Sequence, residues 1–273
     1  MSGFPSSATR FRDGARAALS ITFDDARASQ LDLAVPILDR HALRGTFYVL
    51  PTNVRDRVDG WREAAATHEI GGHSEAHPVP AGRHGPGDTT LEMYTTTRMK
   101  AELARADDEI EALVGVRPQT FAYPAGYTYV GEGARAASYV PVVARRYVAG
   151  RAYRSEFAND PEWCDFAQLQ AAHIDGFDSA ALLALVDAAI EDGRWLILVA
   201  HEVDGDGAWS LASNALDELC RDVAGRPDLW VAPVVDVAHH LRAQRPRRTA
   251  VHVRRHYLSG RAHLAVLRRR FAR

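Results

Sequence analysis

The sequence of 273 residues contains only two cysteines, Cys164 and Cys220. Their number and spacing fit neither a disulfide framework nor a thiolate metal site, so we expect two reduced thiols. No apolar run approaches the roughly 20 residues that span a bilayer. Residues 1–20 also lack the apolar stretch of a secretory signal, which predicts a cytoplasmic protein.

The sequence also lacks a large net charge of either sign. Its formal net charge is −2 at pH 7, which gives no general attraction to nucleic acid or membrane. The charge is nevertheless uneven, because residues 245–273 contain ten arginines and neither Asp nor Glu. Apolar residues of this tail fall on one helical face. Two interpretations stay open: a terminal helix packed on the main body, or a basic amphipathic segment that docks on anionic lipid or an acidic partner.

Short apolar runs alternate with longer helical patterns along residues 1–244. The predicted strands are 17–23, 45–50, 68–73, 118–123, 142–148, 195–200 and 229–235. The clearest predicted helices are 91–115, 179–193 and 212–225. This alternation is typical of parallel βα units, and their number favours one barrel domain over an open sheet. We therefore predict an α/β barrel over residues 1–244, followed by the basic tail.

Four of the predicted strands end in polar or loop-forming groups. These groups are Asp24 and Asp25, His73 and His77, the segment 124–126, and His201. In a parallel barrel the carboxyl ends of the strands meet at one rim, where the chemistry of such folds is found. The sequence therefore predicts a functional site built from four separate strand ends.

The histidines and carboxylates at this rim match a metal site. His73 and His77 are four residues apart, a spacing that places both side chains on one side of a helical turn. Adjacent carboxylates after a buried strand are costly unless a cation shares them. One Asp and two His give three N and O ligands with an open fourth position, as in catalytic zinc sites. The second Asp is then free to act as a base.

The same segments resemble the motifs of a known family. The sequences "TFDD" (22–25), "HSEAHP" (73–78), "FAYPAG" (121–126) and "LILVAH" (196–201) are similar, in order, to motifs of the polysaccharide deacetylases, the NodB-homology or carbohydrate esterase family 4 group. The resemblance implies a distorted (β/α)7-8 barrel. It also implies metal-dependent removal of N- or O-acetyl groups from sugars.

The resemblance also assigns roles to individual residues. It implies that Asp25, His73 and His77 hold zinc or another divalent transition metal such as cobalt. Asp24 is then the general base and His201 the general acid, and the backbone N–H of Ala125 binds the oxyanion. Zinc lowers the pKa of water to near ~7 and so supplies a nucleophile at neutral pH.

The sequence departs from the family at two supporting positions. The family often has Arg two residues before the proline of its third motif, where this chain has Ala122. Arg151, at the end of another apolar segment, is the candidate replacement, and an ordinary surface arginine is the alternative. The Asp that supports the catalytic histidine is not obvious either, and we favour Asp165 over Asp160.

Several side chains near the motif loops are candidates for substrate binding. We select Pro124, Tyr127 and Trp209, while Tyr129 and Trp163 are further aromatic residues close to these loops. Packing within loops or core is the competing explanation for each aromatic side chain. A cytoplasmic location favours a small acylated saccharide or lipid-linked precursor over an extracellular polymer.

Three other functions compete with a sugar deacetylase. Hydrolysis of a non-sugar amide on the same scaffold is one, although such relatives commonly alter the metal triad that this chain keeps. A sugar-binding module without activity would have no need of both Asp24 and His201. A phosphotransferase of the haloacid dehalogenase type needs D-x-D after its strand, whereas Asp24 and Asp25 are adjacent.

Overall fold

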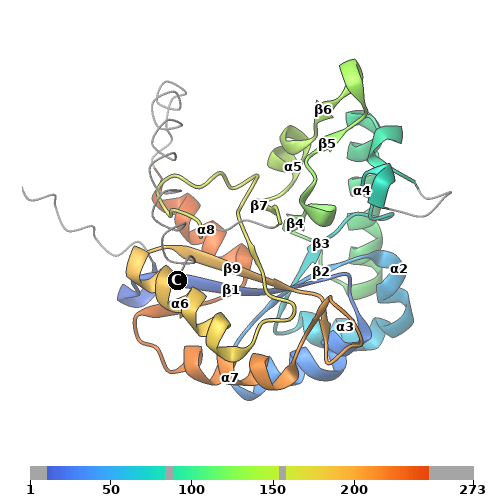
Figure 1. The fold of residues 1–273 in the computed structure, drawn as a ribbon. Helices are drawn as coiled ribbons and strands as arrows, with labels where there is room; N and C mark the ends of the chain where they lie inside the picture. Colours follow the sequence, from blue (N-terminus) through green and yellow to red (C-terminus); the bar gives the residue numbers. More distant parts are fainter. Residues whose placement is uncertain (1–10, 84–88, 154–157, 246–273) are drawn as a thin grey trace, which may run out of the picture.

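A curled parallel sheet forms the centre of the protein (Figure 1). The computed structural model describes residues 11–83, 89–153 and 158–245. The strand order is β7-β4-β3-β2-β1-β9-β8, with β12 also paired to β1, and all of these pairs are parallel. Helices lie against the outside of the curl, and β7 and β8 remain its two edges. This arrangement is the distorted barrel that the sequence predicts.

The elements have the following bounds. The sheet contains β1 (Ala17–Asp24), β2 (Thr46–Val49), β3 (Glu69–Gly72), β4 (Thr120–Ala122), β7 (Ala149–Arg151), β8 (Ala172–His173), β9 (Trp195–Ala200) and β12 (Leu229–Val231). The α-helices are α1 (Val35–Arg40), α2 (Pro51–Val54), α3 (Val58–Ala65), α4 (Thr96–Val114), α5 (Val140–Arg146), α6 (Ser179–Asp192), α7 (Ser213–Ala224) and α8 (Val234–Gln244). Two small pairs, β5 (Tyr129–Val130) with β6 (Ala137–Ser138) and β10 (Glu202–Val203) with β11 (Ser210–Leu211), lie outside the sheet.

Strand β1 organises the sheet because it is the only described strand with three neighbours. It pairs with β9 over residues 18–23. On its other side, β12 pairs with residues 17–19 and β2 with residues 22–24. All eight residues of β1 are buried, as expected for a parallel strand covered on both faces.

The two faces of the strands differ in chemistry. In β1 the residues Leu19, Ile21 and Phe23 belong to the apolar core between sheet and helices, and they alternate with Ser20, Thr22 and Asp24. Because side chains of a strand alternate between faces, Ser20, Thr22 and Asp24 point into the curl. Thr46 and Tyr48 of β2 and Thr120 of β4 are buried in the same alternating register. The interior of the curl is therefore polar.

The helices begin and end where local chemistry predicts. Helix α4 is capped by the Thr95 side chain, which accepts from the Arg98 N–H, and ends at Gly115 in the left-handed conformation (φ 89°). Helix α6 is capped in the same way by Asp178 and ends at Gly193 (φ 65°). Both helices lie within predicted helical segments.

Two strand predictions are wrong in whole or in part. Residues 142–148 fall mostly in helix α5, and the strand that follows, β7, begins only at residue 149. Pro141 in the first turn favours a helix, since its fixed φ suits that position and its missing N–H is not needed there. The predicted strand at 229–235 ends at Val231, because Pro233 caps helix α8.

Both interpretations of the basic tail (245–273) depend on residues 246–273, which lie outside the described residues. Arg245, its first residue, is described and donates hydrogen bonds to the carbonyl oxygens of Pro161 and Cys164. Among the described helices, none is long and apolar enough to cross a membrane.

The close packing inside the curl predicts that Gly71→Ala destabilises the fold. A Cβ at Gly71 would lie 2.5 Å from two ring carbons of Tyr48, which has no exposed surface. Overpacking of this kind costs roughly 1–3 kcal/mol. We expect urea denaturation to show that loss. Gly82→Ala is the matched control, because a Cβ there meets nothing within 4 Å; equal unfolding free energies for the two variants would contradict the prediction.

Candidate metal centre and active site

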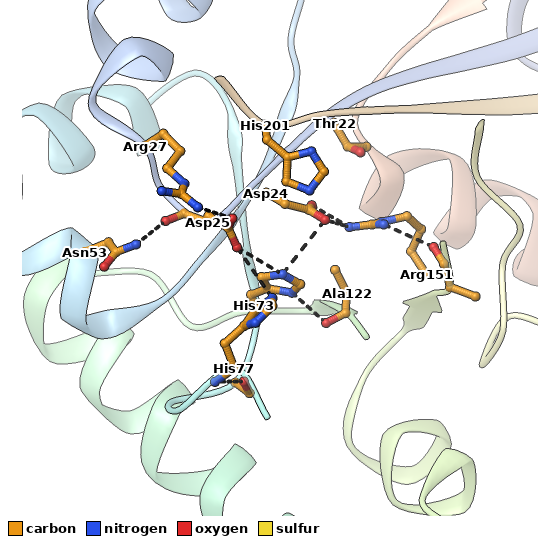
Figure 2. Close-up of polar contacts among 12 residues, drawn as sticks. Thr22, Asp24, Asp25, Arg27, Asn53, His73, His77, Ala122, Arg151 and His201 are labelled. Atoms are coloured by element: carbon orange, nitrogen blue, oxygen red, sulfur yellow. Dashed lines mark hydrogen bonds and ion pairs between the residues drawn. The ribbon is translucent and has the colours of Figure 1, made fainter. Parts of the chain in front are cut away.

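The carboxyl ends of five strands bring polar side chains together at one rim. Figure 2 shows Asp24, Asp25, His73, Arg151 and His201 among them. Asp24 and Asp25 end or follow β1, His73 follows β3, and His201 follows β9. Arg151 ends β7, on the far side of the curl. The remaining contributor is β8, which places Asp175 beside His201.

Asp25, His73 and His77 form a three-ligand cluster. The Asp25 Oδ1 atom lies 3.5 Å from His73 Nε2 and 3.6 Å from His77 Nε2. All three ligand atoms fall within 4.8 Å of one another. Ligands at the usual 2.0–2.2 Å from a tetrahedral zinc ion are about 3.3–3.6 Å apart. The donor set and its spacing therefore fit a divalent transition metal.

The imidazole of His73 is held in the orientation that a metal ligand needs. Its Nδ1 lies 2.8 Å from the carbonyl oxygen of Ala122. Since a carbonyl only accepts, Nδ1 is the donor of this bond, and Nε2 on the opposite side of the ring faces Asp25, where it can bind a metal once deprotonated. Hydrogen bonds of this kind fix the tautomer and the ring plane of ligating histidines. His73 is 1% exposed, so bulk water does not compete for this bond.

Asp25 is positioned by contacts on its other side. Arg27 donates to Asp25 Oδ2 at 2.9 Å, and the Asn53 side chain donates to the Asp25 carbonyl at 2.7 Å. Burial raises the pKa of Asp25, but the hydrogen bond from His73 and the charges of His73, His77 and Arg27 outweigh it. The pKa is lowered well below its ordinary value. Asp25 is thus an anion at neutral pH, as a carboxylate metal ligand must be.

The adjacent Asp24 turns toward a different partner. Arg151 NH2 lies 2.5 and 2.6 Å from the two carboxylate oxygens of Asp24. Arg151 has no exposed surface, and its guanidinium carbon lies 4.9 Å from the Tyr48 ring centroid. The alternative of an ordinary surface arginine is therefore wrong. Asp24 Oδ2 is 3.9 Å from His73 Nε2, so the fixed carboxylate lies next to the three-ligand cluster.

His201 is supported by Asp175. Its Nδ1 lies 2.6 Å from Asp175 Oδ2, and its backbone N–H donates to Asp175 Oδ1 at 3.0 Å. Burial lowers the pKa of His201, but the hydrogen bond to Asp175 and the charges of Asp24, Asp175 and Asp25 raise it overall. His201 thus holds its proton more firmly than an exposed imidazole.

The preference for Asp165 as the supporting residue is wrong. The Asp165 carboxylate accepts from the Ala167 N–H and the Gln168 side chain within its own loop. Asp160, the other candidate, accepts from the Glu162 N–H and from Arg194. Both carboxylates are already used by nearby donors, and neither contacts His201.

A second cluster beside the first has the geometry of hydrogen bonds. His173 Nε2 and His201 Nδ1 lie 2.7 and 2.6 Å from the same oxygen, Asp175 Oδ2. These separations are shorter than the distance of about 3.3–3.6 Å between two ligand atoms of a tetrahedral zinc ion. They are ordinary lengths for charge-assisted hydrogen bonds, so both histidines are hydrogen-bonded to Asp175 in this cluster.

The loop after β4 contains the predicted oxyanion donor. Ala125 has φ 47° and Gly126 has φ 79°, so the backbone turns sharply and leaves the Ala125 side chain exposed. Pro124 is buried at the start of this turn. The turn follows Ala122, whose carbonyl holds His73, and the Ala125 N–H therefore belongs to the same rim.

The candidate substrate-binding aromatics occupy different environments. Trp209 is 46% exposed, and its ring centroid lies 5.3 Å from that of His201. Tyr127 packs at the edge of the apolar cluster that includes Tyr139, whose hydroxyl donates to the Tyr127 carbonyl. Tyr129 and Trp163 are 61% and 49% exposed. Among these four candidates, Trp209 is the one whose ring packs against His201.

Sequence reasoning missed Asp175 and His173. Strand β8 contains only residues 172 and 173, too short for an alternating pattern to reveal. The available signal was the sequence "HID" (173–175), which lies shortly before the N-capped helix α6. In a parallel βα unit, residues between a strand and the next helix lie at the rim where the site is found.

Comparisons with known proteins agree with this fold. A family model described as "Polysaccharide deacetylase" matches residues 12–139. A protein from Mycobacterium smegmatis that is classed with the polysaccharide deacetylases superposes with a TM-score of 0.64 at 18% identity, covering 90% of this chain and 98% of that one. The resemblance to the polysaccharide deacetylases is confirmed.

Two further relatives extend the comparison. A family 4 acetyl xylan esterase from Clostridium thermocellum, solved with a cobalt ion, has a TM-score of 0.52 at 17% identity and covers 81% of this chain and 89% of that one. At such identities the similarity shows the deacetylase fold alone. The uncharacterized protein YlxY of Bacillus subtilis (strain 168) is 33% identical over 97 residues, which are 35% of this chain and 27% of YlxY. This chain thus matches about a quarter of that relative's length.

The two clusters of this deacetylase fold predict different responses to metal. We expect chelated protein reloaded with zinc to bind one ion per chain, and His77→Ala to abolish that binding, because it removes one of three ligands. His173→Ala is the matched control and should keep the ion. Elemental analysis after dialysis measures the stoichiometry. Two ions per chain, or equal losses in both variants, would contradict the assignment.

Proposed function

We propose that this chain is a metal-dependent hydrolase that removes acetyl groups from N- or O-acetylated sugars. The observation that carries the proposal is the grouping of a three-ligand N/O cluster with a fixed buried carboxylate and a carboxylate-supported histidine. These are the groups that hydrolysis of an amide or ester requires: a Lewis acid site, a base and an acid.

Asp25, His73 and His77 would hold the metal, zinc or a similar divalent ion such as cobalt. The metal supplies a Lewis acid that polarises the acyl carbonyl. The chain itself holds two of the three side chains in place, since His73 and Asp25 are buried and hydrogen-bonded to neighbouring groups. The cobalt complex of the Clostridium thermocellum esterase supports a divalent metal in this fold.

Asp24 would act as the general base. Its carboxylate borders the metal cluster and accepts the proton of the attacking water. Arg151 contacts both carboxylate oxygens, so Asp24 cannot rotate away from the cluster without breaking a buried ion pair. Arg151 would thereby perform the orienting task for which related sequences use an arginine at the position of Ala122.

His201 would act as the general acid. The Asp175 carboxylate accepts a hydrogen bond from Nδ1–H, which leaves the Nε2 side of the ring for the leaving group. A departing amine needs a proton because an amide anion is a very poor leaving group. The raised pKa of His201 keeps that proton available at neutral pH. The Ala125 N–H would stabilise the oxyanion, as fixed backbone donors do in acyl transfer.

The exposed ring of Trp209 beside His201 would provide a platform for the sugar. Trp209 is therefore the residue that best supports a sugar rather than another amide as substrate. Hydrolysis of a non-sugar amide is the second candidate function, because the acid, base and metal ligands would serve it equally.

We predict metal-dependent acetate release from a substrate panel. The panel contains N-acetylglucosamine oligomers, acetylated xylan and simple acetanilides, each assayed with zinc, cobalt or chelator. Asp24→Asn should keep the metal but lose about 10²–10⁴-fold in turnover, because it removes the base while the ligands stay. Asp165→Asn is the control and should retain activity. Hydrolysis of anilides without any sugar turnover would favour the second candidate, and loss of metal in Asp24→Asn would mean that the two carboxylates have exchanged roles.

The raised pKa of His201 predicts the shape of the pH profile. An acid must be protonated to act, so the fall of kcat at high pH should lie above the ordinary imidazole value of about 6.5. Asp175→Asn removes the negative charge that helps to raise this pKa and replaces one of the two acceptor oxygens by an amide donor, so the fall should move to lower pH. Steady-state kinetics from pH 5 to pH 9 measure the shift, and an unchanged high-pH limb in Asp175→Asn would exclude His201 as the titrating acid.

A further inference from the structure

Glu102 is a buried carboxylate for which the proposed chemistry has no use. It lies in the middle of α4 and is 2% exposed. Its neighbours on the buried face of the helix, Met99, Leu103 and Ala106, are apolar. A buried carboxylate is unfavourable without hydrogen-bond donors, so the partners of Glu102 indicate its purpose.

The partners of Glu102 come from the loop that joins the two histidine ligands. Glu102 Oε1 accepts from the backbone N–H groups of Ala76 at 3.2 Å and Glu75 at 3.4 Å. Glu102 Oε2 accepts from the Tyr94 hydroxyl. Two successive backbone N–H groups directed at one oxygen form a small anion-binding nest. The nest belongs to residues 75 and 76, directly before His77.

This loop has an unfavourable backbone conformation. Ser74 has φ 70° and His77 has φ 47°, values that cost non-glycine residues about 1–3 kcal/mol each and persist only when the surroundings impose them. One restraint is internal, since the His77 N–H donates to Ser74 Oγ at 3.0 Å. A further restraint comes from α4, through Glu102.

A second contact from α4 reaches the same loop. Arg105, three residues after Glu102 and therefore on the same side of the helix, donates to the Glu75 carboxylate at 2.9 and 3.1 Å. Arg105 is 59% exposed at its side chain, so this ion pair is worth little by itself. Glu102 is the buried contact and hence the stronger restraint.

We propose that Glu102 is a positioning residue for the metal centre, which sets the place of His77 by binding the loop before it. The proposal rests on the proposed function, since it assumes that Asp25, His73 and His77 bind a metal. His73 is fixed independently by strand β3 and the Ala122 carbonyl. Removal of the Glu102 acceptor therefore releases His77 while His73 and Asp25 keep their places.

The test compares Glu102→Leu with Glu102→Gln in the full chain. Leucine has a similar volume but no acceptor, whereas glutamine keeps an oxygen for the two N–H groups. Loss of a partner that supports a ligand typically lowers metal affinity by about 10–100-fold. We expect that loss for Glu102→Leu, and affinity close to wild type for Glu102→Gln. Competition titrations with zinc give the Kd, and the visible d–d bands of the cobalt form report the coordination of His77.

Matched variants separate positioning from general stability. Tyr94→Phe removes the only described side-chain donor to Oε2 and leaves the nest intact, so its metal affinity should match wild type. Thermal denaturation of each metal-free variant shows whether it is folded. If Glu102→Leu does not fold, Glu102→Asp replaces it: the charge stays, but the shorter side chain draws the acceptor away from the nest, and the Kd should rise by about tenfold.

Each outcome decides the proposal. A rise in Kd for folded Glu102→Leu or Glu102→Asp, with altered cobalt bands and recovery in Glu102→Gln, supports it. Unchanged affinity in a folded variant overturns it while the metal centre itself stands. Absence of zinc binding in the wild-type protein overturns the proposed function together with this inference.

Discussion

The buried ion pair between Asp24 and Arg151 is the contact on which the rest of the site depends. Asp24 ends β1 and Arg151 ends β7, and three strands, β2, β3 and β4, separate them in the sheet. A flat sheet would hold these side chains far apart. They meet only because the sheet curls and because strand alternation turns both into its interior. Removal of one partner would leave an unpaired buried charge, a loss of about 3–5 kcal/mol.

This pair also explains how two adjacent carboxylates serve different purposes. Asp24 is the last residue of β1 and points into the curl toward Arg151. Asp25 has φ 77°, so the chain turns sharply after the strand, and its carboxylate faces His73 and His77 instead. The turn thereby places the proposed base beside a proposed metal ligand. The same interior packs Tyr48 beneath Arg151, which is why its small neighbour Gly71 is needed.

Much of this arrangement follows from local patterns in the sequence. The apolar segment of β1 and the helical periods of α4, α6 and α7 predict the barrel. His73 and His77 do meet at one site, but the helical turn expected from their spacing is wrong, since Ser74 (φ 70°) and His77 (φ 47°) have left-handed backbone conformations. The pattern fails where tertiary context decides. Residues 142–148 contain three valines and a tyrosine, which favour a strand, yet Pro141 and the burial of Val143 place residues 142–146 in helix α5. Asp175 follows a strand of two residues, so its pairing with His201 is set by the sheet and leaves almost no local signal.

The role of Arg151 lies between these cases. The family resemblance implies an orienting arginine at the position of Ala122, and Arg151, at another strand end, is the candidate replacement beside the alternative of a surface arginine. The hydrophobic pattern of a sequence does not indicate which side chains meet across the inside of a curled sheet. The contact with Asp24, and the absence of exposed surface at Arg151, come from the three-dimensional structure alone.

A double-mutant cycle on this pair tests the central claim most directly. The claim is that Arg151 acts on turnover through Asp24. The account predicts that Arg151→Met lowers kcat nearly as much as Asp24→Asn, and that the double variant is no slower than Asp24→Asn alone, because residues that act as one unit are not additive. Losses in kcat that simply multiply in the double variant would show that Arg151 and Asp24 act independently, and would contradict the account.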